Sequence, residues 1–210
     1  MDEFDRLIVK YPELEACRGD LEGAYQLLKA CFLGGGKLLA CGNGGSAADS
    51  EHIVGELMKG FLKRRPLPDD LRRRLAAAYP EEGAFLADHL QGALPAISLV
   101  NQVALNTAFA NDVAPEMVFA QQVYGHGRPG DVLLGISTSG NALNVLRAAQ
   151  VARVLGLKTL GLSGADGGKL RALCDVTICV PWSATADIQE RHLPVIHALC
   201  AKLENEFFGS

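Results

Sequence analysis

Several features of specialised protein classes are missing from this sequence. Its 210 residues contain no apolar run near the roughly 18 residues of a membrane span, no internal repeat and no low-complexity tract. The six cysteines form no CxxC pair, so we expect reduced, buried thiols and no cysteine-type zinc site. The acidic N-terminal stretch has no signal-peptide core, which favours a cytoplasmic location. A net charge of -4 gives no reason to expect nucleic acid or membrane partners.

What remains is the composition of an ordinary globular domain. Hydrophobic residues make up 49% of the chain and charged residues 21%, and 210 residues is the size of one domain. We therefore predict a single domain over residues 1–210, with N-terminal helices within residues 1–36. A polar insertion over about residues 63–91 contains three prolines, and we expect it to form one or two short helices.

Short apolar runs alternate with helical patterns along the chain. The predicted strands cover residues 37–41, 95–100, 131–136, 158–163 and 176–180. The predicted helices cover residues 2–10, 20–32, 47–62, 102–109, 115–123, 142–155, 168–174 and 188–207. The strands are continuously apolar, which is typical of parallel strands buried on both faces. The sequence therefore predicts an α/β protein, a three-layer α/β/α sandwich with a five-stranded parallel sheet.

Two loops rich in glycine and hydroxyl groups follow the first and third predicted strands. Residues 42–46 read GNGGS and residues 137–141 read STSGN. Ligands of parallel sheets bind beyond the carboxyl ends of the strands, where helix N-termini present free N–H groups. The hydroxyls of Ser137, Thr138 and Ser139 suit a phosphate. Neither loop is a Walker A or GxGxxG motif, and ordinary turns with capping serines are the alternative.

Two helices carry the candidate chemical groups. His52 and Glu56 stand four residues apart, so they share a helix face and could hold a metal ion or act as an acid–base pair. A simple surface pair is the alternative. The terminal helix offers Gln189, His192 and His197. In a straight helix Gln189 and His197 would lie about 12 Å apart. They reach one ion only if Gln189 precedes the helix or the chain bends near Pro194, and His192 is the competing ligand.

Four separated motifs together resemble the phosphoheptose isomerases of the sugar isomerase (SIS) domain family. They are CGNGGSAADSEHIVGEL, the pair Asn111-Asp112, GDVLLGISTSGN and IQERHLPVIH. The resemblance implies a flavodoxin-like fold, a homotetramer and one zinc ion per subunit. It also implies the interconversion of sedoheptulose 7-phosphate and D-glycero-D-manno-heptose 7-phosphate. An isomerase of another sugar phosphate and a non-catalytic SIS-domain adaptor or sensor are the alternatives.

The resemblance assigns roles residue by residue. It places Glu56 and His197 as the acid–base residues. The implied substrate-binding residues are Asn43, Gly44, Gly45, Ser46, Glu56, Asn111, Asp112, Ser137, Thr138, Ser139 and Gln189. The implied zinc ligands are His52, Glu56, Gln189 and His197. The sequence departs from the family at Ala142, where a substrate-contacting serine is common, and in its longer insertion. Because non-catalytic SIS proteins tend to lose the metal and acid–base residues, their presence here favours an enzyme.

Overall fold

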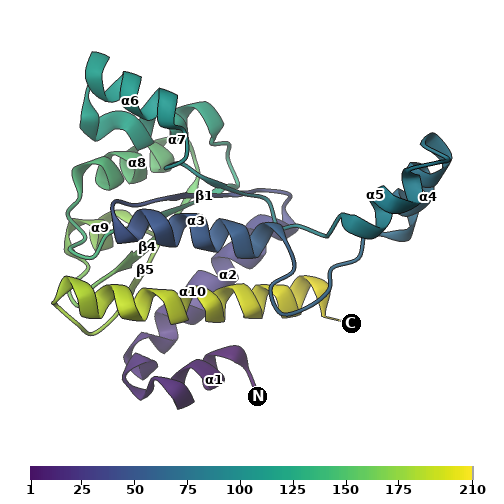
Figure 1. The fold of residues 1–210 in the computed structure, drawn as a ribbon. Coiled ribbons are helices and arrows are strands. Elements are labelled where there is room, and N and C mark those ends of the chain that lie inside the picture. Colours follow the sequence, from purple (N-terminus) through teal and green to yellow (C-terminus); the bar gives the residue numbers. More distant parts are fainter. Residues whose placement is uncertain (210) are drawn as a thin grey trace.

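The computed structural model describes residues 1–209 and forms one sheet of five parallel strands (Figure 1). The strands are β1 (Leu38–Cys41), β2 (Ala96–Ser98), β3 (Val132–Ile136), β4 (Lys158–Ser163) and β5 (Val176–Cys179). Their order across the sheet is β2-β1-β3-β4-β5, which is the flavodoxin-like order. The five-stranded parallel sheet predicted from the apolar runs is confirmed.

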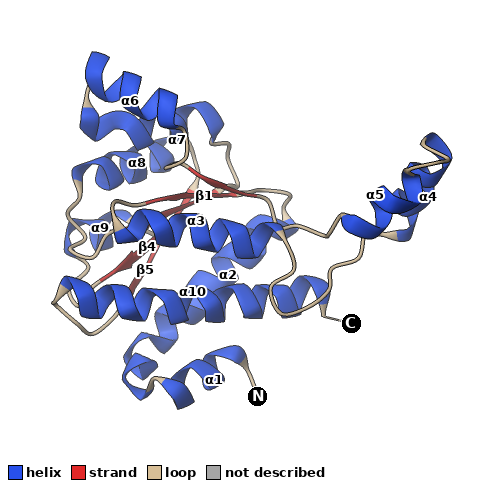
Figure 2. Ribbon diagram, in the orientation of Figure 1, coloured by secondary structure: helices blue, strands red, loops and turns tan. Residues whose placement is uncertain are grey.

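Helices cover both faces of this sheet (Figure 2). The α-helices are α1 (Glu3–Lys10), α2 (Arg18–Leu33), α3 (Gly45–Met58), α4 (Asp69–Ala78), α5 (Gly83–His89), α6 (Val103–Asp112), α7 (Val118–His126), α8 (Leu143–Val154), α9 (Gly168–Leu173) and α10 (Thr185–Phe208). Two 3-10 turns, η1 (Pro12–Cys17) and η2 (Pro115–Met117), connect neighbouring elements.

Alternate residues of β1 enter two separate apolar layers. Leu38 and Ala40 of β1 pack in a cluster with residues of α2, α3 and α10. Leu39 and Cys41 pack in a second cluster with residues of α7, α8 and α9. Because successive strand side chains point to opposite faces, one continuously apolar strand serves both layers. The predicted three-layer sandwich is therefore confirmed.

The cysteines and the polar insertion behave largely as expected. All six cysteines are free thiols, although Cys174 and Cys179 are only half-buried. The insertion forms α4 and α5, which pack against each other and project from the body of the molecule as an arm (Figure 1). Every residue of α4 is at least partly exposed. Within residues 1–209, no helix is both long and apolar enough to cross a membrane.

Three predicted helix boundaries were wrong. The helix predicted over residues 47–62 ends at Met58, because distant side chains bind the N–H groups that would have continued it. Gln91 binds that of Gly60, and the Glu204 carboxylate binds those of Phe61 and Leu62. The terminal helix begins at Thr185, three residues early, with Asp187 in its positively polarised first turn, and it continues through Pro194. The helix predicted over residues 115–123 is a 3-10 turn followed by α7.

Candidate active site

The chain changes direction across the sheet at β1. From β1 it passes first to β2 on one side, and it later returns to β3 on the other side. At such a switch point the loops leaving the two adjacent strands diverge and open a crevice at the carboxyl edge. The loops that leave β1 and β3 are residues 42–46 and 137–141, so the structure places both special loops at this point, as predicted.

An amide pair ties the first loop to the helix that follows the second. Asn43 Nδ2 donates to Asn144 Oδ1 at 2.9 Å, and Asn144 Nδ2 donates back to Asn43 Oδ1 at 2.8 Å. Asn144 lies in the first turn of α8. Sequence reasoning missed this residue, because an asparagine at a helix start reads as a local cap and carries no sign of a partner 101 residues away.

The serine-rich loop is held by its backbone, which leaves hydroxyl groups near the surface. The Ser137 N–H donates to the Leu162 carbonyl at 3.0 Å, and the Ser163 hydroxyl donates to the Ser137 carbonyl at 2.7 Å. Gly140 has φ +62°, and a Cβ there would collide with the Gly167 carbonyl, so the turn requires glycine. Thr138 is half-buried and Ser139 is exposed at the edge of the sheet. A fixed turn of this kind at a helix N-terminus suits an anionic group.

Helices α3 and α10 lie side by side and run in the same direction (Figure 1). Near the start of α3, Gly45 faces the Gln189 side chain so closely that any Cβ would collide with it. Two turns further along, His52 of α3 faces His197 of α10. The pairing of equivalent turns is what brings together side chains that are 145 residues apart in sequence.

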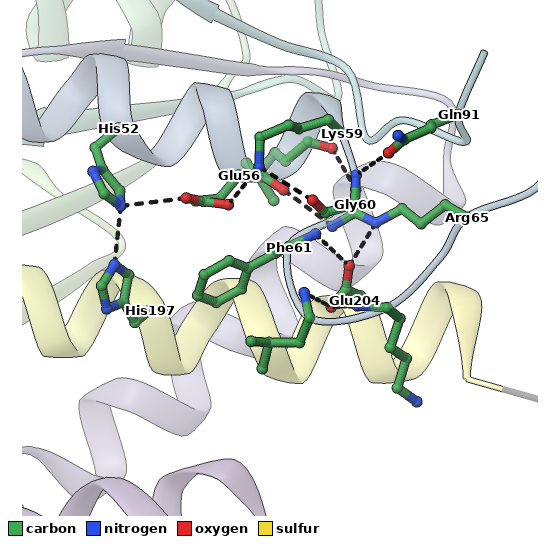
Figure 3. A network of polar contacts seen from close by, with 12 residues as sticks. His52, Glu56, Lys59, Gly60, Phe61, Arg65, Gln91, His197 and Glu204 are labelled. Carbon is green, nitrogen blue, oxygen red and sulfur yellow. Dashed lines mark hydrogen bonds and ion pairs between the residues drawn. The ribbon is translucent and has the colours of Figure 1, made fainter. Parts of the chain in front are cut away.

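His52, Glu56 and His197 form a polar cluster between these helices (Figure 3). The Nε2 atoms of His52 and His197 lie 2.9 Å apart, and His52 Nε2 lies 3.5 Å from Glu56 Oε1. Lys59 Nζ lies 3.3 Å from the other carboxylate oxygen of Glu56. The Phe61 ring lies 5.3 Å from the His197 ring, measured between centroids. The Glu56 side chain is 16% exposed, so it is sheltered yet open to solvent on one side.

The environment favours the neutral form of His197. Burial lowers the pKa of His197, the neighbouring His52 ring and Lys10 lower it further, and Glu56 opposes them. In the 2.9 Å contact one imidazole donates its Nε2–H and the other accepts at a bare Nε2. A neutral imidazole beside a carboxylate can accept or release a proton without a large electrostatic cost, which is what acid–base catalysis near neutral pH needs.

Comparisons with known proteins agree with this site. A sequence model of the SIS domain matches residues 11–78 and 82–164. A phosphoheptose isomerase of Rhodospirillum rubrum is 38% identical over 189 residues, which are 90% of this chain and 87% of the relative. The chain belongs to the SIS-domain family of phosphoheptose isomerases. The expected family is therefore confirmed, and the protein is an isomerase.

Solved isomerase structures show the same fold over nearly the whole chain. A phosphoheptose isomerase of Neisseria gonorrhoeae superposes with a TM-score of 0.75 at 34% identity, covering 96% of this chain and 95% of the other. One from Francisella tularensis superposes with a TM-score of 0.76 at 30% identity, covering 96% and 94%. The flavodoxin-like SIS fold expected from the motifs is confirmed.

The family's zinc ligands are only partly assembled in this structure. Ligands of a tetrahedral zinc ion stand roughly 3.3–3.6 Å apart when each metal bond is 2.0–2.2 Å long. The 3.5 Å between His52 and Glu56 fits that spacing, whereas the 2.9 Å between His52 and His197 is too short. Among the residues the structure describes, no three histidine, cysteine, aspartate or glutamate side chains are arranged to hold a metal ion.

Gln189 was the expected fourth zinc ligand and His192 its competitor. The structure places neither side chain beside His52, Glu56 and His197. Because α10 is helical from Thr185, Gln189 lies about 12 Å along the axis from His197, and its side chain rests on Gly45. To share one ion, both side chains would have to extend toward each other. His192 is fully buried, and its Nε2 faces the Ser163 carbonyl at 3.4 Å. It therefore lies apart from His52 and His197.

Asn111 and Asp112 lie in the other helical layer. They end α6, which packs on α7 and η2, and the Asn111 side-chain amide donates to Asp112 Oδ1 at 2.9 Å. Both residues are exposed. Their assignment to substrate binding stays a prediction.

A second titratable pair lies in the interface between α3 and α10. Asp49 Oδ2 and His192 Nδ1 lie 4.0 Å apart, and within residues 1–209 neither buried atom has a hydrogen-bond partner. Burial raises the pKa of Asp49 to about 6, an effect that His52 opposes. Burial lowers the pKa of His192 to about 4, and its hydrogen bond to Ser163 opposes that. Both groups are therefore held toward their neutral forms.

These two shifts predict opposite and compensating effects of pH on stability. For His192 the unfolded chain binds the extra proton between about pH 4 and 6.5, so its contribution to stability rises with pH. For Asp49 the folded chain binds the extra proton between about pH 3.8 and 6, so its contribution falls as pH rises. Asp49→Asn removes only the contribution of Asp49, which is the one that falls as pH rises.

As pH rises from 4 to 6.5, we expect the free energy of unfolding of Asp49→Asn to increase relative to that of the parent by on the order of 1–3 kcal/mol. Urea unfolding at a series of pH values measures this difference. Glu51→Gln, an exposed change on the same helix, is the control and should follow the parent curve. Parallel curves for Asp49→Asn and the parent would show that folding does not shift the pKa of Asp49.

Proposed function

We propose that this isomerase interconverts sedoheptulose 7-phosphate and D-glycero-D-manno-heptose 7-phosphate. The observation that carries the proposal is the cluster of His52, Glu56 and His197 on two helices, one of which starts at the loop after β1. A carboxylate and a neutral imidazole stand together there, and the helix that carries the carboxylate starts at the sheet edge where the serine-rich loop lies. The names of the relatives support a heptose phosphate as substrate.

The reaction needs only a base, an acid and a fixed substrate. A base removes the hydrogen from C1 of the ketose, which gives an enediol, and the hydrogen returns at C2. The proton of the C1 hydroxyl moves to the C2 oxygen as the carbonyl shifts from C2 to C1, so no external oxidant is involved. We assign the carbon-bound proton to Glu56 and the oxygen-bound proton to His197. The sheltered carboxylate and the neutral ring are suited to these roles.

A screen of the purified protein tests the proposed substrate. We expect it to isomerise seven-carbon ketose and aldose phosphates faster than the five- and six-carbon compounds, because the family relatives are heptose enzymes. Glu56→Gln nearly preserves size and should lower kcat at least roughly 100-fold, the usual scale for losing acid–base help. A preference for a shorter sugar would contradict the heptose assignment, and full activity of Glu56→Gln would contradict the assigned base.

We further propose that Ser137, Thr138 and Ser139 bind the substrate phosphate, with Asn43, Gly44, Gly45 and Ser46 bordering the sugar. Ser137→Ala/Ser139→Ala should raise KM about tenfold or more, because two hydroxyl donors to a charged group are lost. The backbone bonds that hold the turn remain, so the unfolding curve should change little. Initial-rate measurements on sugar phosphates provide the test, and a parental KM would exclude these hydroxyls from phosphate binding.

One zinc ion per subunit is also part of the proposal. His52, Glu56 and His197 would hold it after the two imidazole rings separate by roughly half an ångström. Gln189, the fourth ligand that the family implies, would have to leave Gly45 and extend along α10 toward His197 to reach the same ion. Bound zinc would polarise the substrate carbonyl. The nitrogen and carboxylate donors gathered here are of the kinds that zinc accepts.

We expect zinc-reconstituted protein to contain one zinc ion per chain and His52→Ala to contain much less. Emission spectroscopy of dialysed samples measures the metal directly, without reference to activity. His126→Ala, which alters a histidine on α7, is the matched control and should retain the parental zinc content. Equal zinc in His52→Ala and the parent would place the metal elsewhere or show that it is adventitious.

The proposed assembly is a homotetramer. Every residue of α6 is at least partly exposed, and Val103 and Val113 at its two ends are 69% and 66% exposed. An apolar helix left open in this way is typical of a surface that another copy covers. The family resemblance supports four copies. A cytoplasmic location, expected from the acidic N-terminal stretch, stays a prediction.

A further inference from the structure

The largest fully buried side chain outside the apolar core is an arginine. Arg65 follows α3 and is 1% exposed, and Glu204 on α10 is equally buried. Arg65 Nε lies 2.8 Å from Glu204 Oε1, and the guanidinium lies over the Phe208 ring at 4.6 Å from its centroid. Burying two charges costs several kcal/mol each unless their remaining hydrogen-bonding capacity is used. The other hydrogen-bond partners of Arg65 and Glu204 therefore decide how much of this cost is offset.

The remaining donors of Arg65 bind the end of α3. Its two terminal nitrogens donate to the carbonyls of Leu57 at 2.7 Å and Glu56 at 3.0 Å. Carbonyls in the last turn of a helix have no partner within the helix, and a cation there also complements the helix dipole. The backbone of Glu56 is thus held directly by the arginine, from the side opposite its carboxylate (Figure 3).

The Glu204 carboxylate also accepts hydrogen bonds from the turn that follows α3. It accepts the backbone N–H groups of Phe61 at 2.8 Å, Leu62 at 2.8 Å and Lys63 at 3.1 Å. This turn folds back toward α10 and sets the Phe61 ring against His197 (Figure 3). The same carboxylate lies on α10 two turns beyond His197 and so ties this turn to the helix that carries the imidazole.

We propose that Arg65 and Glu204 are positioning residues for the isomerisation, holding Glu56 through the end of α3 and His197 through Phe61. The proposal rests on the acid–base roles given to Glu56 and His197 under the proposed function. A buried ion pair is often replaceable by apolar side chains without loss of stability. This one joins the backbones beside both reacting groups across two helices, and small errors in such placement lower rates steeply.

Arg65→Lys tests the positioning role with the charge retained. One ammonium nitrogen replaces three separated guanidinium nitrogens, so the carboxylate and both carbonyls cannot all be bound in the same geometry. We expect kcat to fall about 10- to 100-fold while KM stays within about twofold of the parent. Arg65→Met/Glu204→Leu removes both charges, so no unpaired charge is left buried, and it should show the same fall in kcat.

A second buried carboxylate provides a matched control. Asp131 pairs with Lys37 Nζ at 2.6 Å and accepts the backbone N–H groups of Lys37 and Arg128, but none of these hydrogen bonds reaches α3, α10 or Phe61. Lys37→Met/Asp131→Leu should therefore leave kcat at the parental value when assayed at a temperature where each variant is folded. Unfolding curves establish that temperature.

Parental kcat in folded Arg65→Lys would overturn the proposal, as would equal losses in the Asp131 control variant. Should the Arg65 variants fail to fold, Phe61→Leu decides, because it removes only the ring set against His197. A loss of kcat at unchanged KM supports the positioning role, and a parental kcat refutes it. Glu56→Gln is assayed alongside. If Glu56→Gln is fully active, the acid–base role given to Glu56 under the proposed function fails; if it is inactive while Arg65→Lys is not, only the positioning role fails.

Discussion

The parallel packing of α3 against α10 is the constraint on which the site depends. It aligns the two helices turn by turn, so that Gly45 meets Gln189 and His52 meets His197. Glycine at position 45 allows the close approach at one end, and the buried Arg65–Glu204 pair fastens the other end. His52, Glu56 and His197 lie between these two contacts.

The sheet supplies the second half of the site. Its strand order changes direction between β1 and β3, and the loops leaving those strands are the ones rich in glycine and serine. The reciprocal Asn43–Asn144 pair joins the loop that leads into α3 to the first turn of α8, the helix that follows the serine-rich loop. The helix that carries His52 and Glu56 and the serine-rich loop thus start at the same edge of the sheet.

The sequence predicted those features that depend on interactions between residues close together in the chain. The continuously apolar runs identified all five strands, and the i,i+4 spacing placed His52 and Glu56 on one face. The end of α3 was missed because a distant carboxylate, that of Glu204, binds N–H groups of Phe61 and Leu62 that would otherwise have continued the helix. The Asn43–Asn144 pair and the burial of Arg65 were missed for the same reason, since each depends on a partner far away in sequence. Arg65 in particular lies within the polar insertion over about residues 63–91, a composition that favours a solvated surface.

Exchange of the C2 hydrogen of the heptose 7-phosphate with solvent tests the central claim most directly. If Glu56 is the base held in this frame, the parent should replace that hydrogen by deuterium in D2O during turnover. Glu56→Gln should then exchange it at least roughly 100-fold more slowly, because the group that takes the carbon-bound proton is gone. Proton magnetic resonance follows the exchange independently of product formation. Exchange by Glu56→Gln at the parental rate would contradict the account and assign the proton to another group.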